Sequence, residues 1–590
     1  MPLIVQKFGG TSVADTQKIL AAARKAIRAQ QQGNQVVMVV SAMGHNTDML
    51  VELAEQITDR PSGREMDMLL STGEQVSVAL MAMAIQSLGA KAISLTGAQI
   101  GIKTDSTHTK ARIQSISTER MQRFLDAGNI VIAAGFQGID EDFNITTLGR
   151  GGSDTTAVAL AAVLRADTCE IYTDVDGVYT TDPRVLPEAR RVKQISYDEM
   201  LELASLGAGV MHSRSIEFGK KFSVPIHVRS SFSDITGTMI VASPEAANQA
   251  VCGAALVRDE ARITIEGVPD RPGFSYAIFS KIAARRIAVD MIVQNIGAEG
   301  RATISFTVPK EELPNALEAT NEAAKEISAK AVTFDEEVAK VSVVGLGMAE
   351  QTGVAQKMFR ALAEAGINIQ AITTSEIKIS VLCHRDQASS ALRVVHKVFG
   401  LENEPANKLQ PNAILPHGNG NTALEVVRHL QGMEDLTIDE ITLDESQGRV
   451  TLLGIPDQPG LAAAVFEEIA AAGVFVDMIV QSFGQNSTAS ISFTVQQSDM
   501  PRSIETAERL AKRFGCAGVS SSPKVAKLSV LGIGIRSNTS VAMRIFQSLS
   551  EVGINVDIMS TSEVRLNVVV DGNKGKEALA ILQQVFEPAR

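Results

Sequence analysis

The sequence is poor in the residues that mark disulfide-bonded and metal-binding proteins. Its 590 residues include four cysteines, which are far apart and show no Cys-x-x-Cys spacing. Cysteines in this arrangement are typical of free thiols in a reducing compartment. The eight histidines are scattered, and no His-Glu-x-x-His motif occurs. We therefore expect neither a disulfide framework nor a metal ion held by the protein itself.

Strong positive charge and long apolar runs are also missing. The net charge is −12, which argues against a nucleic acid or an anionic membrane as the main partner. Apolar runs such as residues 129–136 end well before the ~20 residues that a membrane helix needs. The chain enters its first predicted strand without a charged and apolar leader. We expect a cytoplasmic protein that contacts neither membrane nor nucleic acid.

A repeat dominates the second half of the sequence. Residues 265–308 align without a gap to residues 452–495, at an offset of 454 − 267 = 187, with 23 of 44 positions identical. Residues 340–383 and 527–570 repeat at the same offset, 527 − 340 = 187, with 18 identities in 44. Identity this high at one constant offset indicates that a block of two different modules was duplicated.

Each module is predicted to be a small βαββαβ sandwich of one sheet and two helices, a ferredoxin-like arrangement. In the first module, a strand at 262–266 precedes a Pro-Asp-x-Pro-Gly turn, an apolar helix and strands at 289–293 and 303–308. The predicted modules span residues 262–335, 340–400, 449–523 and 527–590. Residues 401–445, rich in Asn, Pro and Gly, are expected to form a linker, and residues 241–260 a shorter connection.

The first part, residues 1–245, alternates strand and helix patterns. Strands are predicted at 3–8, 36–41, 91–95, 130–134, 170–173 and 225–229, with helices between them. This alternation is typical of a three-layer α/β domain, in which helices cover both faces of a mostly parallel sheet. Ligands of such domains collect beyond the carboxyl ends of the strands.

A glycine-rich turn follows the first predicted strand. In the segment Lys7-Phe8-Gly9-Gly10-Thr11, backbone N–H groups, a helix N-terminus and a lysine come together, as phosphate binding requires. Alone, the same string would also fit an ordinary strand-to-helix turn. Three later segments favour the phosphate site.

The later segments place charged and polar groups near other predicted strand ends. Residues 148–155 set three glycines around Arg150, which predicts an anion-binding backbone nest beside a bidentate cation. Residues 172–184 form a polar loop with aromatic rings, carboxylates and an arginine suited to a nucleotide. Glu74 is expected just inside a helix start, where compensating the helix dipole is its simplest role. No P-loop or protein-kinase signature occurs, so a phosphoryl transferase of another architecture is predicted.

These motifs resemble those of a known family. The strings KFGGTSV, VVSAMG, STGEQ, LGRGGSDTTA and TDVDGVYTTDPR are similar, in this order and at these intervals, to the aspartokinases of the amino-acid-kinase family. The modules, with GVPDRPG, GINI and TSE, resemble the amino-acid-binding ACT domains fused to these kinases. The resemblance covers essentially the whole chain, although the commoner layout of the family has one ACT pair.

The resemblance implies transfer of the γ-phosphoryl group of Mg²⁺-bound ATP to the side-chain carboxylate of L-aspartate. The product would be 4-phospho-L-aspartate, the first intermediate on the way to lysine, threonine, methionine and isoleucine. A carboxylate nucleophile needs no general base, so positioning and charge neutralisation would provide the catalysis. The metal would be held mainly by the nucleotide.

The resemblance also implies roles for single residues, with Arg150 gripping the α-carboxylate of aspartate and Glu74 pairing with its ammonium group. The residues implied are, for catalysis, Lys7, Gly9, Gly10, Arg150 and Asp154; for aspartate, Ser41, Thr47, Glu74, Arg150, Gly151, Gly152 and Ser153; and for ATP, Lys7, Phe8, Gly9, Gly10, Thr173, Asp174, Tyr179, Thr180, Asp182 and Arg184. Many relatives carry a lysine where Gly209 stands, and Arg184 or Lys220 is expected to compensate for its absence.

Matched polar residues in the two blocks suggest a regulatory site. They are Asp270, Gln294, Asn368, Ser375 and Glu376 in the first block, and Asp457, Gln481, Asn555, Ser562 and Glu563 in the second. They could bind the ammonium and carboxylate of an amino acid, or simply cap turns and satisfy edge backbone. By resemblance the effectors are lysine and threonine. Exposed module edges also predict a homo-oligomer, at least a dimer.

Two alternatives remain open at the level of sequence. A kinase of the same family could act on glutamate or acetylglutamate, because fold alone does not decide the substrate. A regulatory amino-acid sensor with an inactive kinase fold is the second alternative. The presence of Lys7, Arg150 and Asp154 argues against it.

Overall fold

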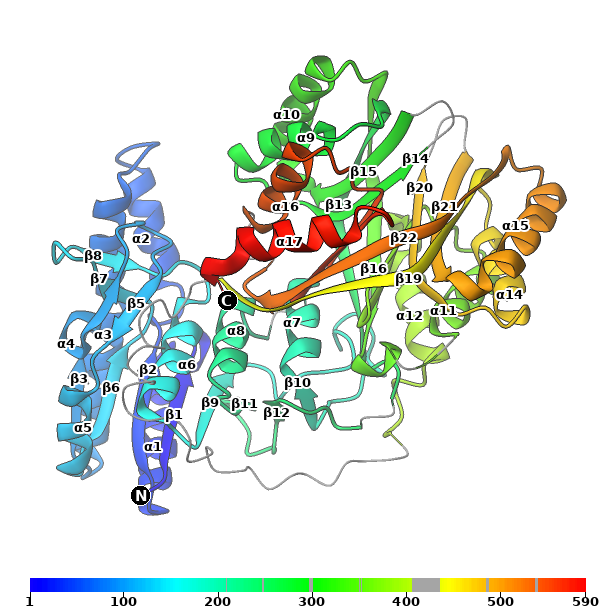
Figure 1. Cartoon of the computed structure of the whole chain (residues 1–590). Helices are drawn as coiled ribbons and strands as arrows, with labels where there is room; N and C mark the ends of the chain where they lie inside the picture. The colour runs from blue at the N-terminus through cyan, green and yellow to red at the C-terminus, as the bar shows by residue number, and fades with distance from the viewer. Residues whose placement is uncertain are drawn as a thin grey trace.

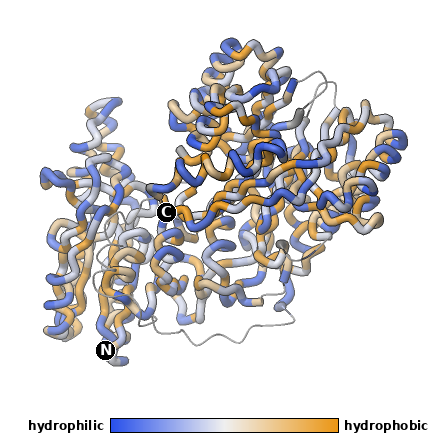
Figure 2. The backbone as a smooth tube through the Cα atoms, in the orientation of Figure 1, coloured by the Kyte–Doolittle hydropathy of each residue, from blue (hydrophilic) through white to orange (hydrophobic). Residues whose placement is uncertain are grey.

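The computed structural model describes the chain except residues 208–209, 247–248, 297–300, 350, 352, 406–435, 484–487, 536–539 and 590. Residues 1–245 lie at the left and bottom of Figure 1, and the four modules lie above and to the right. Hydrophobic positions concentrate where strands and helices pack together in both parts (Figure 2).

An eight-stranded sheet forms the centre of the first part. Its order is β10-β12-β11-β9-β1-β2-β6-β3, and its pairings are parallel apart from that between β11 and β12, which is antiparallel. The strands are β1 (Leu3–Phe8), β2 (Gln35–Val40), β3 (Ala92–Leu95), β6 (Ile130–Ala134), β9 (Thr168–Thr173), β10 (Gln194–Ser196), β11 (Ile226–Ser230) and β12 (Thr238–Val241). The predicted mostly parallel sheet is confirmed.

Helices cover both faces of this sheet, because its central strands are apolar on both sides. Along β2, Met38 packs with α1 (Thr16–Gln31) and α3 (Gly63–Ser87), whereas its neighbour Val39 faces α6 (Gly152–Leu164). The remaining helices of this part are α2 (Asn46–Glu55), α4 (Gly97–Ile100), α5 (Glu119–Asp126), α7 (Tyr197–Ser205) and α8 (Ser213–Lys221). The three-layer arrangement is confirmed.

Helix α3 is long and apolar enough, by length and composition, to cross a membrane, but half of that apolar stretch is buried inside the protein. It packs against α1, β3, β6 and β8 (Ile145–Thr147). It also carries two buried carboxylates, Asp67 and Glu74. We interpret α3 as a core helix of the first part.

A smaller sheet, in the order β5-β4-β7-β8, lies beside α3. Its other strands are β4 (Ile102–Thr104), β5 (Ile113–Ile116) and β7 (Gln137–Ile139). The β7–β8 hairpin joins the end of β6 to the start of α6. It therefore connects a central strand to a helix that covers the sheet, at the edge where ligands are expected.

The modules share one twelve-stranded sheet, β14-β15-β13-β16-β18-β17-β20-β21-β19-β22-β24-β23. The first block consists of β13 (Gly253–Pro269), α9 (Phe274–Ala284), β14 (Asp290–Ile296), β15 (Arg301–Pro309), α10 (Leu313–Glu326), β16 (Ala331–Val344), α11 (Val354–Glu364), β17 (Ala371–Thr374), β18 (Lys378–His384) and α12 (Ala388–Val398). The second consists of β19 (Thr437–Pro456), α14 (Leu461–Ala471), β20 (Val476–Phe483), β21 (Thr488–Gln496), α15 (Met500–Phe514), β22 (Gly518–Ile533), α16 (Ser540–Glu551), β23 (Ile558–Thr561), β24 (Arg565–Asp571) and α17 (Gly575–Phe586).

Long strands change the expected module boundaries. β13 begins at Gly253, inside the predicted connection 241–260, and its residues 253–257 pair with residues 340–344 of β16. The last strand of the second module therefore comes from before the first module. In the second block, residues 437–444 of β19 pair with residues 527–533 of β22 in the same way. The predicted linker is thus wrong from Thr437 onward, and its residues 406–435 lie outside the described chain.

The two blocks pack crosswise. The first and fourth modules share one core, in which Phe279 stacks on Phe546 with ring centroids 5.7 Å apart. The second and third modules share another core, in which the rings of Phe359 and Phe466 lie 5.6 Å apart. β17 also pairs with β20 in antiparallel register. Each module therefore completes its core with a module of the other block.

Candidate active site

The carboxyl ends of β1, β2, β6 and β9 bring the predicted segments to one edge of the sheet. The turn after β1 packs against the turn after β2, because a Cβ on Gly10 would lie 2.9 Å from the carbonyl oxygen of Ala42. The N–H of Ser41 donates to the carbonyl of Phe8 (3.1 Å). Thr47 follows in the first turn of α2. The structure thus places Gly10, Ser41 and Thr47 around one junction.

Lys7 and Asp154 face each other at this junction. The Lys7 Nζ lies 2.6 Å from Oδ1 of Asp154, and both side chains are nearly buried. The same Nζ is 3.5 Å from the point where a Cβ on Gly9 would stand. Phe8, by contrast, is fully buried and stacks on Tyr172 with ring centroids 4.7 Å apart. Phe8 as a whole residue is therefore closed to a ligand in this structure, whereas the Lys7 ammonium lies beside the glycine turn.

Glu74 lies in the middle of α3 and not at a helix start, so the predicted dipole role is wrong. The helix begins earlier, at Gly63, and its buried residues ahead of Glu74, at Asp67, Leu70 and Ser71, keep the helical spacing of three to four residues. Glu74 is buried, and its Oε1 accepts the N–H of Ala42 (3.1 Å). Burial raises its pKa to about 7, against the lowering effect of that hydrogen bond. Its Oε2 is buried without a hydrogen-bond partner among the described residues.

The glycines at 149–152 form the predicted turn at the start of α6. Gly149 and Gly151 adopt φ values of 77° and 72°, which favour glycine. Arg150 between them is exposed, whereas Ser153 is buried beside Gly135 at the end of β6. The nest therefore presents Arg150 at its rim and Ser153 at its base.

Two residues around the nest have no counterpart among the sequence predictions. His212 lies against Gly151, since a Cβ there would be 2.4 Å from the Cβ of His212, and burial lowers its pKa. Phe136 adopts φ 70° directly after β6, and its N–H donates to Thr156 Oγ1 (3.1 Å). Phe136 could have been suspected from the sequence, because Gly135-Phe136 directly follows a buried strand. His212 is distant in sequence and offered none.

The loop after β9 divides into an open and a buried part. Asp174 is exposed and accepts the Thr173 hydroxyl (3.1 Å), and the Tyr179 hydroxyl donates to Asp176 (2.8 Å). Thr180, predicted to bind ATP, is fully buried, and its Oγ1 lies 2.9 Å from Nε2 of His396 on α12. Its hydroxyl therefore faces the second module, and the sequence could not show this contact.

The cations expected to replace the missing lysine are already paired. Arg184 is exposed and makes a bidentate contact with Asp182, 2.8 Å at its shortest. Lys220 lies 2.7 Å from Asp198. Gly209 itself lies outside the described residues.

Most of the predicted effector residues lie at two interfaces, one between the first and fourth modules and one between the second and third. Asn555 donates to Asp270 (2.6 Å) and Gln294 to the carbonyl of Val556 (2.9 Å), which joins the fourth module to the first. The equivalent contacts of Asn368 with Asp457 (2.8 Å) and of Gln481 with Ile369 (2.9 Å) join the second to the third. Each set therefore combines residues from both blocks.

Ser375 and Glu376 line a cavity of about 610 Å³ between the second and third modules. Asp477, which sequence reasoning missed, lies in the same wall, and it contacts Lys527 at 2.5 Å. The equivalent cavity between the first and fourth modules, which Ser562 lines, measures about 90 Å³. The backbone N–H of Glu563 instead donates to Glu202 of α7 (2.7 Å).

Comparisons with known proteins agree with this geometry. The amino acid kinase family matches residues 2–230, and the ACT domain matches residues 263–323, 341–399, 450–509 and 528–586. An aspartate kinase of Stutzerimonas stutzeri is 50% identical over 409 residues, which cover 69% of this chain and 99% of that protein.

Two solved proteins are also similar. The aspartate kinase of Synechocystis is 39% identical with a TM-score of 0.52, and the match covers 99% of this chain and 98% of that one. Aspartokinase III of E. coli, solved with aspartate and ADP, is 25% identical with a TM-score of 0.57, over 67% of this chain and 99% of that one. The same enzyme was also solved with lysine and aspartate, at a TM-score of 0.55, 25% identity and coverage of 68% and 99%. The chain therefore belongs to the aspartokinase family, in which an amino-acid kinase domain is joined to ACT domains.

Proposed function

We propose that this enzyme transfers the γ-phosphoryl group of ATP to the side-chain carboxylate of L-aspartate, releasing 4-phospho-L-aspartate and ADP. In this reaction the carboxylate oxygen attacks the γ-phosphorus, and the bond to the β-phosphate oxygen breaks. Aspartokinase III of E. coli, with aspartate and ADP bound, supports both substrates. The product leads towards lysine, threonine, methionine and isoleucine.

The buried, unpartnered Oε2 of Glu74 is the observation that supports the substrate best. A buried carboxylate oxygen without a donor is costly, so a ligand ammonium group would satisfy it. Arg150, at the exposed rim of the nest, would then hold the α-carboxylate bidentately. This leaves the β-carboxylate of aspartate to point towards Lys7.

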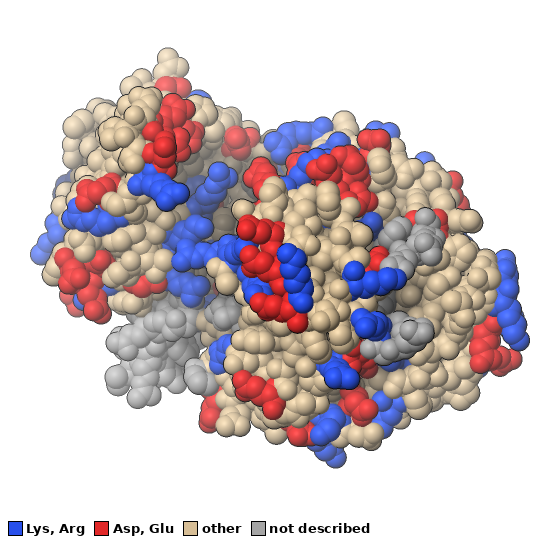
Figure 3. Space-filling model, turned by 90° about the horizontal axis from the view of Figure 1, so that it is seen from above, with Lys and Arg blue, Asp and Glu red and all other residues tan. Residues whose placement is uncertain are grey.

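Lys7 would stabilise the charge that develops on the transferred phosphoryl group, while Gly9 and Gly10 let it approach the backbone. Asp154 holds the Lys7 ammonium in place. Mg²⁺ would be bound mainly by the phosphates of ATP. Lys and Arg side chains gather where the lobe at the left meets the rest of the molecule (Figure 3), and such a surface attracts anionic substrates despite the negative net charge.

The substrate is tested by measuring ADP release with aspartate, glutamate and acetylglutamate. Aspartate should give the highest kcat/KM. A preference for glutamate or acetylglutamate would overturn the assignment of aspartate, and no ADP release with any of them would favour the inactive sensor.

The proposal includes feedback inhibition by lysine and threonine through the ACT modules. The cavity beside Ser375 and Glu376 is large enough for an amino acid, and E. coli aspartokinase III binds lysine. In this structure Lys527 and Arg565 neutralise its acidic wall at Asp477 and Glu376. The ammonium group of a lysine ligand would take over part of this role. The Asn368–Asp457–Gln481 site is nearly closed, with about 10 Å³ of space, so a ligand there would have to open it.

Inhibition is tested with lysine and threonine, singly and combined, on the full chain and on Gln294→Ala and Gln481→Ala. Each substitution should weaken inhibition by at least one of the two amino acids, because it removes a contact at one interface between the blocks. Absence of inhibition at millimolar concentrations of both would refute the regulatory proposal.

We also infer a cytoplasmic homo-oligomer, at least a dimer. Edge strands and exposed sheet faces of small modules tend to be covered by pairing, and symmetric dimers are the commonest oligomers. Light scattering at micromolar concentration is the test, and a monomer would contradict the inference.

A further inference from the structure

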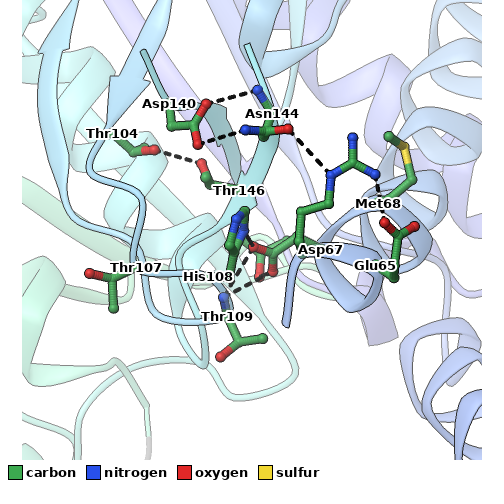
Figure 4. Close-up of polar contacts among 12 residues, drawn as sticks. Glu65, Asp67, Met68, Thr104, Thr107, His108, Thr109, Asp140, Asn144 and Thr146 are labelled. Carbon is green, nitrogen blue, oxygen red and sulfur yellow. Dashed lines mark hydrogen bonds and ion pairs between the residues drawn. The ribbon is translucent and has the colours of Figure 1, made fainter. Parts of the chain in front are cut away.

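A buried carboxylate outside every predicted motif lies next to the proposed aspartate site. Asp67 of α3 is fully buried and contacts residues of two other segments (Figure 4). Its Oδ2 lies 2.7 Å from Nδ1 of His108, and its Oδ1 accepts the N–H of Thr109 (3.0 Å) and the hydroxyl of Thr147 (2.5 Å). Three partners for one buried carboxylate make this a rigid junction, because each of them offsets the cost of its burial.

The partners of Asp67 lead directly to the glycine nest. Thr147 is the last residue of β8, three positions before Arg150. The carbonyl oxygen of Thr109 would be 3.1 Å from a Cβ on Gly149, so the loop before β5 touches the nest. The N–H of Ala111 also donates to the carbonyl of Thr147 (2.9 Å). Asp67 therefore fixes both the strand that enters the nest and the loop that lies against it.

The same helix presents Glu74. Residues seven apart in an α-helix lie on nearly the same face, ~10 Å apart along the axis. Between them, the Ser71 carbonyl accepts a hydrogen bond from Gln137 of β7 (3.0 Å). Helix α3 is thus attached to the β7–β8 hairpin through Asp67 and Ser71, and Arg64 at the start of the helix also donates to Asn144 (3.3 Å).

We propose that Asp67 is a positioning residue for the amino-acid substrate. It fastens the Arg150 nest to the helix that bears Glu74. It thereby sets the separation between the groups that hold the α-carboxylate and the α-ammonium. This inference rests on the proposed function. A shift of about 1 Å at such a site is enough to cost ~100-fold in activity.

The test compares Asp67→Asn and Thr147→Val with the wild type. In Asp67→Asn, an amide NH₂ replaces one carboxylate oxygen and faces groups that themselves donate hydrogen bonds. In Thr147→Val, the hydroxyl that donates to Asp67 is removed at nearly constant side-chain volume. Both variants should raise the KM for aspartate, about tenfold or more for Asp67→Asn, while the KM for ATP stays within twofold. Calorimetry should show the same loss of aspartate affinity without turnover.

Glu65→Gln is the matched control, since Glu65 is an exposed carboxylate on the same helix (Figure 4), and its KM for aspartate should not change. A merely structural role would lower the melting temperature but leave the KM for aspartate unchanged, or raise both KM values together, and either result would overturn the proposal. Thr147→Val decides the matter if Asp67→Asn does not fold. If the wild type prefers another amino acid, the proposed substrate is wrong, and the KM for that acid tests Asp67 instead.

Discussion

At the scale of single residues, the site is organised by charges held out of water. Lys7 and Asp154 form a nearly buried pair, and Glu74 lies under the turn after β2 with one oxygen unpartnered. Groups held in this way are already oriented before substrate binds, so little reorganisation is needed during phosphoryl transfer.

Replacing Lys7 by alanine should lower kcat by ~100- to 1,000-fold, because the ammonium group would neutralise charge that develops in the transition state. The melting temperature should also fall, because the nearly buried Asp154 loses its partner, so turnover is compared at a temperature where both proteins are folded. Lys18→Ala, at a partly exposed lysine of α1, is the control and should keep wild-type turnover in the same ADP-release assay. Turnover of Lys7→Ala within threefold of the wild type would refute the role of Lys7.

The raised pKa of Glu74 predicts opposite pH trends for stability and for substrate binding. Its carboxyl group has a pKa of about 7 in the folded protein against 4.5 in the unfolded chain. Ionising it therefore costs about 3 kcal/mol more in the folded protein than in the unfolded chain. The folded protein is therefore most stable, as far as Glu74 is concerned, below pH 4.5, where the group is protonated in both states. It loses this stability as the pH rises towards and through 7. The affinity for aspartate should instead rise over the same range, because the ammonium group needs the ionised form.

Thermal melting of the wild type and Glu74→Gln between pH 5 and pH 8 measures the first trend. The wild type should lose stability relative to the variant as the pH rises. Calorimetric titration of the wild type with aspartate measures the second. A difference in melting temperature that is independent of pH would contradict the raised pKa.

At the scale of elements, the site depends on turns that pack against one another. The start of α6 lies on His212, ahead of α8, and the turn after β1 lies on the turn after β2. Glycine is required where a left-handed backbone and a close neighbour coincide. The nest at Gly151 meets both conditions, whereas Gly207 after α7 meets only the first.

Gly151→Ala should therefore be more damaging than Gly207→Ala. Both residues adopt positive φ, 72° and 90°, so alanine strains the backbone at both by about 1 kcal/mol. At Gly151 the new Cβ would also lie 2.4 Å from His212, whereas at Gly207 no heavy atom of the described residues, apart from its neighbours in the chain, lies within 4 Å. Thermal melting and the KM for aspartate should both worsen in the first variant. Equal effects in the two variants would show that contact with His212 is unimportant.

At the scale of the whole molecule, one kinase helix touches both regulatory blocks. Glu202 of α7 is fully buried; its Oε2 lies 2.9 Å from Lys378 of the second module, and its Oε1 accepts the N–H of Glu563 in the fourth. Ten residues further along the chain, His212 lies against Gly151. Movement of the modules therefore has a short physical route to the nest.

Glu202→Gln should weaken inhibition by lysine about tenfold or more, while turnover without effectors stays within twofold. Glutamine keeps an acceptor for Glu563 but removes the charge that pairs with Lys378. Glu404→Gln is the control, because its ion pair with Lys193 also joins the two parts but is exposed on both sides, and such pairs contribute little. Unchanged lysine inhibition in Glu202→Gln would exclude this route.

The sequence by itself determined the parallel sheet, the glycine turn at Lys7, the nest at Arg150 and the duplication of the modules. These features depend on neighbouring residues and on repeats of a fixed period, which a single chain displays directly. Only the tertiary structure decided which module packs with which, because the contacts of Phe279 with Phe546 and of Phe359 with Phe466 join residues more than 100 positions apart. It likewise decided the pairing of the strands at residues 253–257 and 437–444, whose partners lie more than 80 residues away. It also decided the position of Glu74 within α3, the burial of Thr180 and the contacts of Asp67. Burial and long-range pairing depend on the packing of distant segments, and no local pattern encodes them.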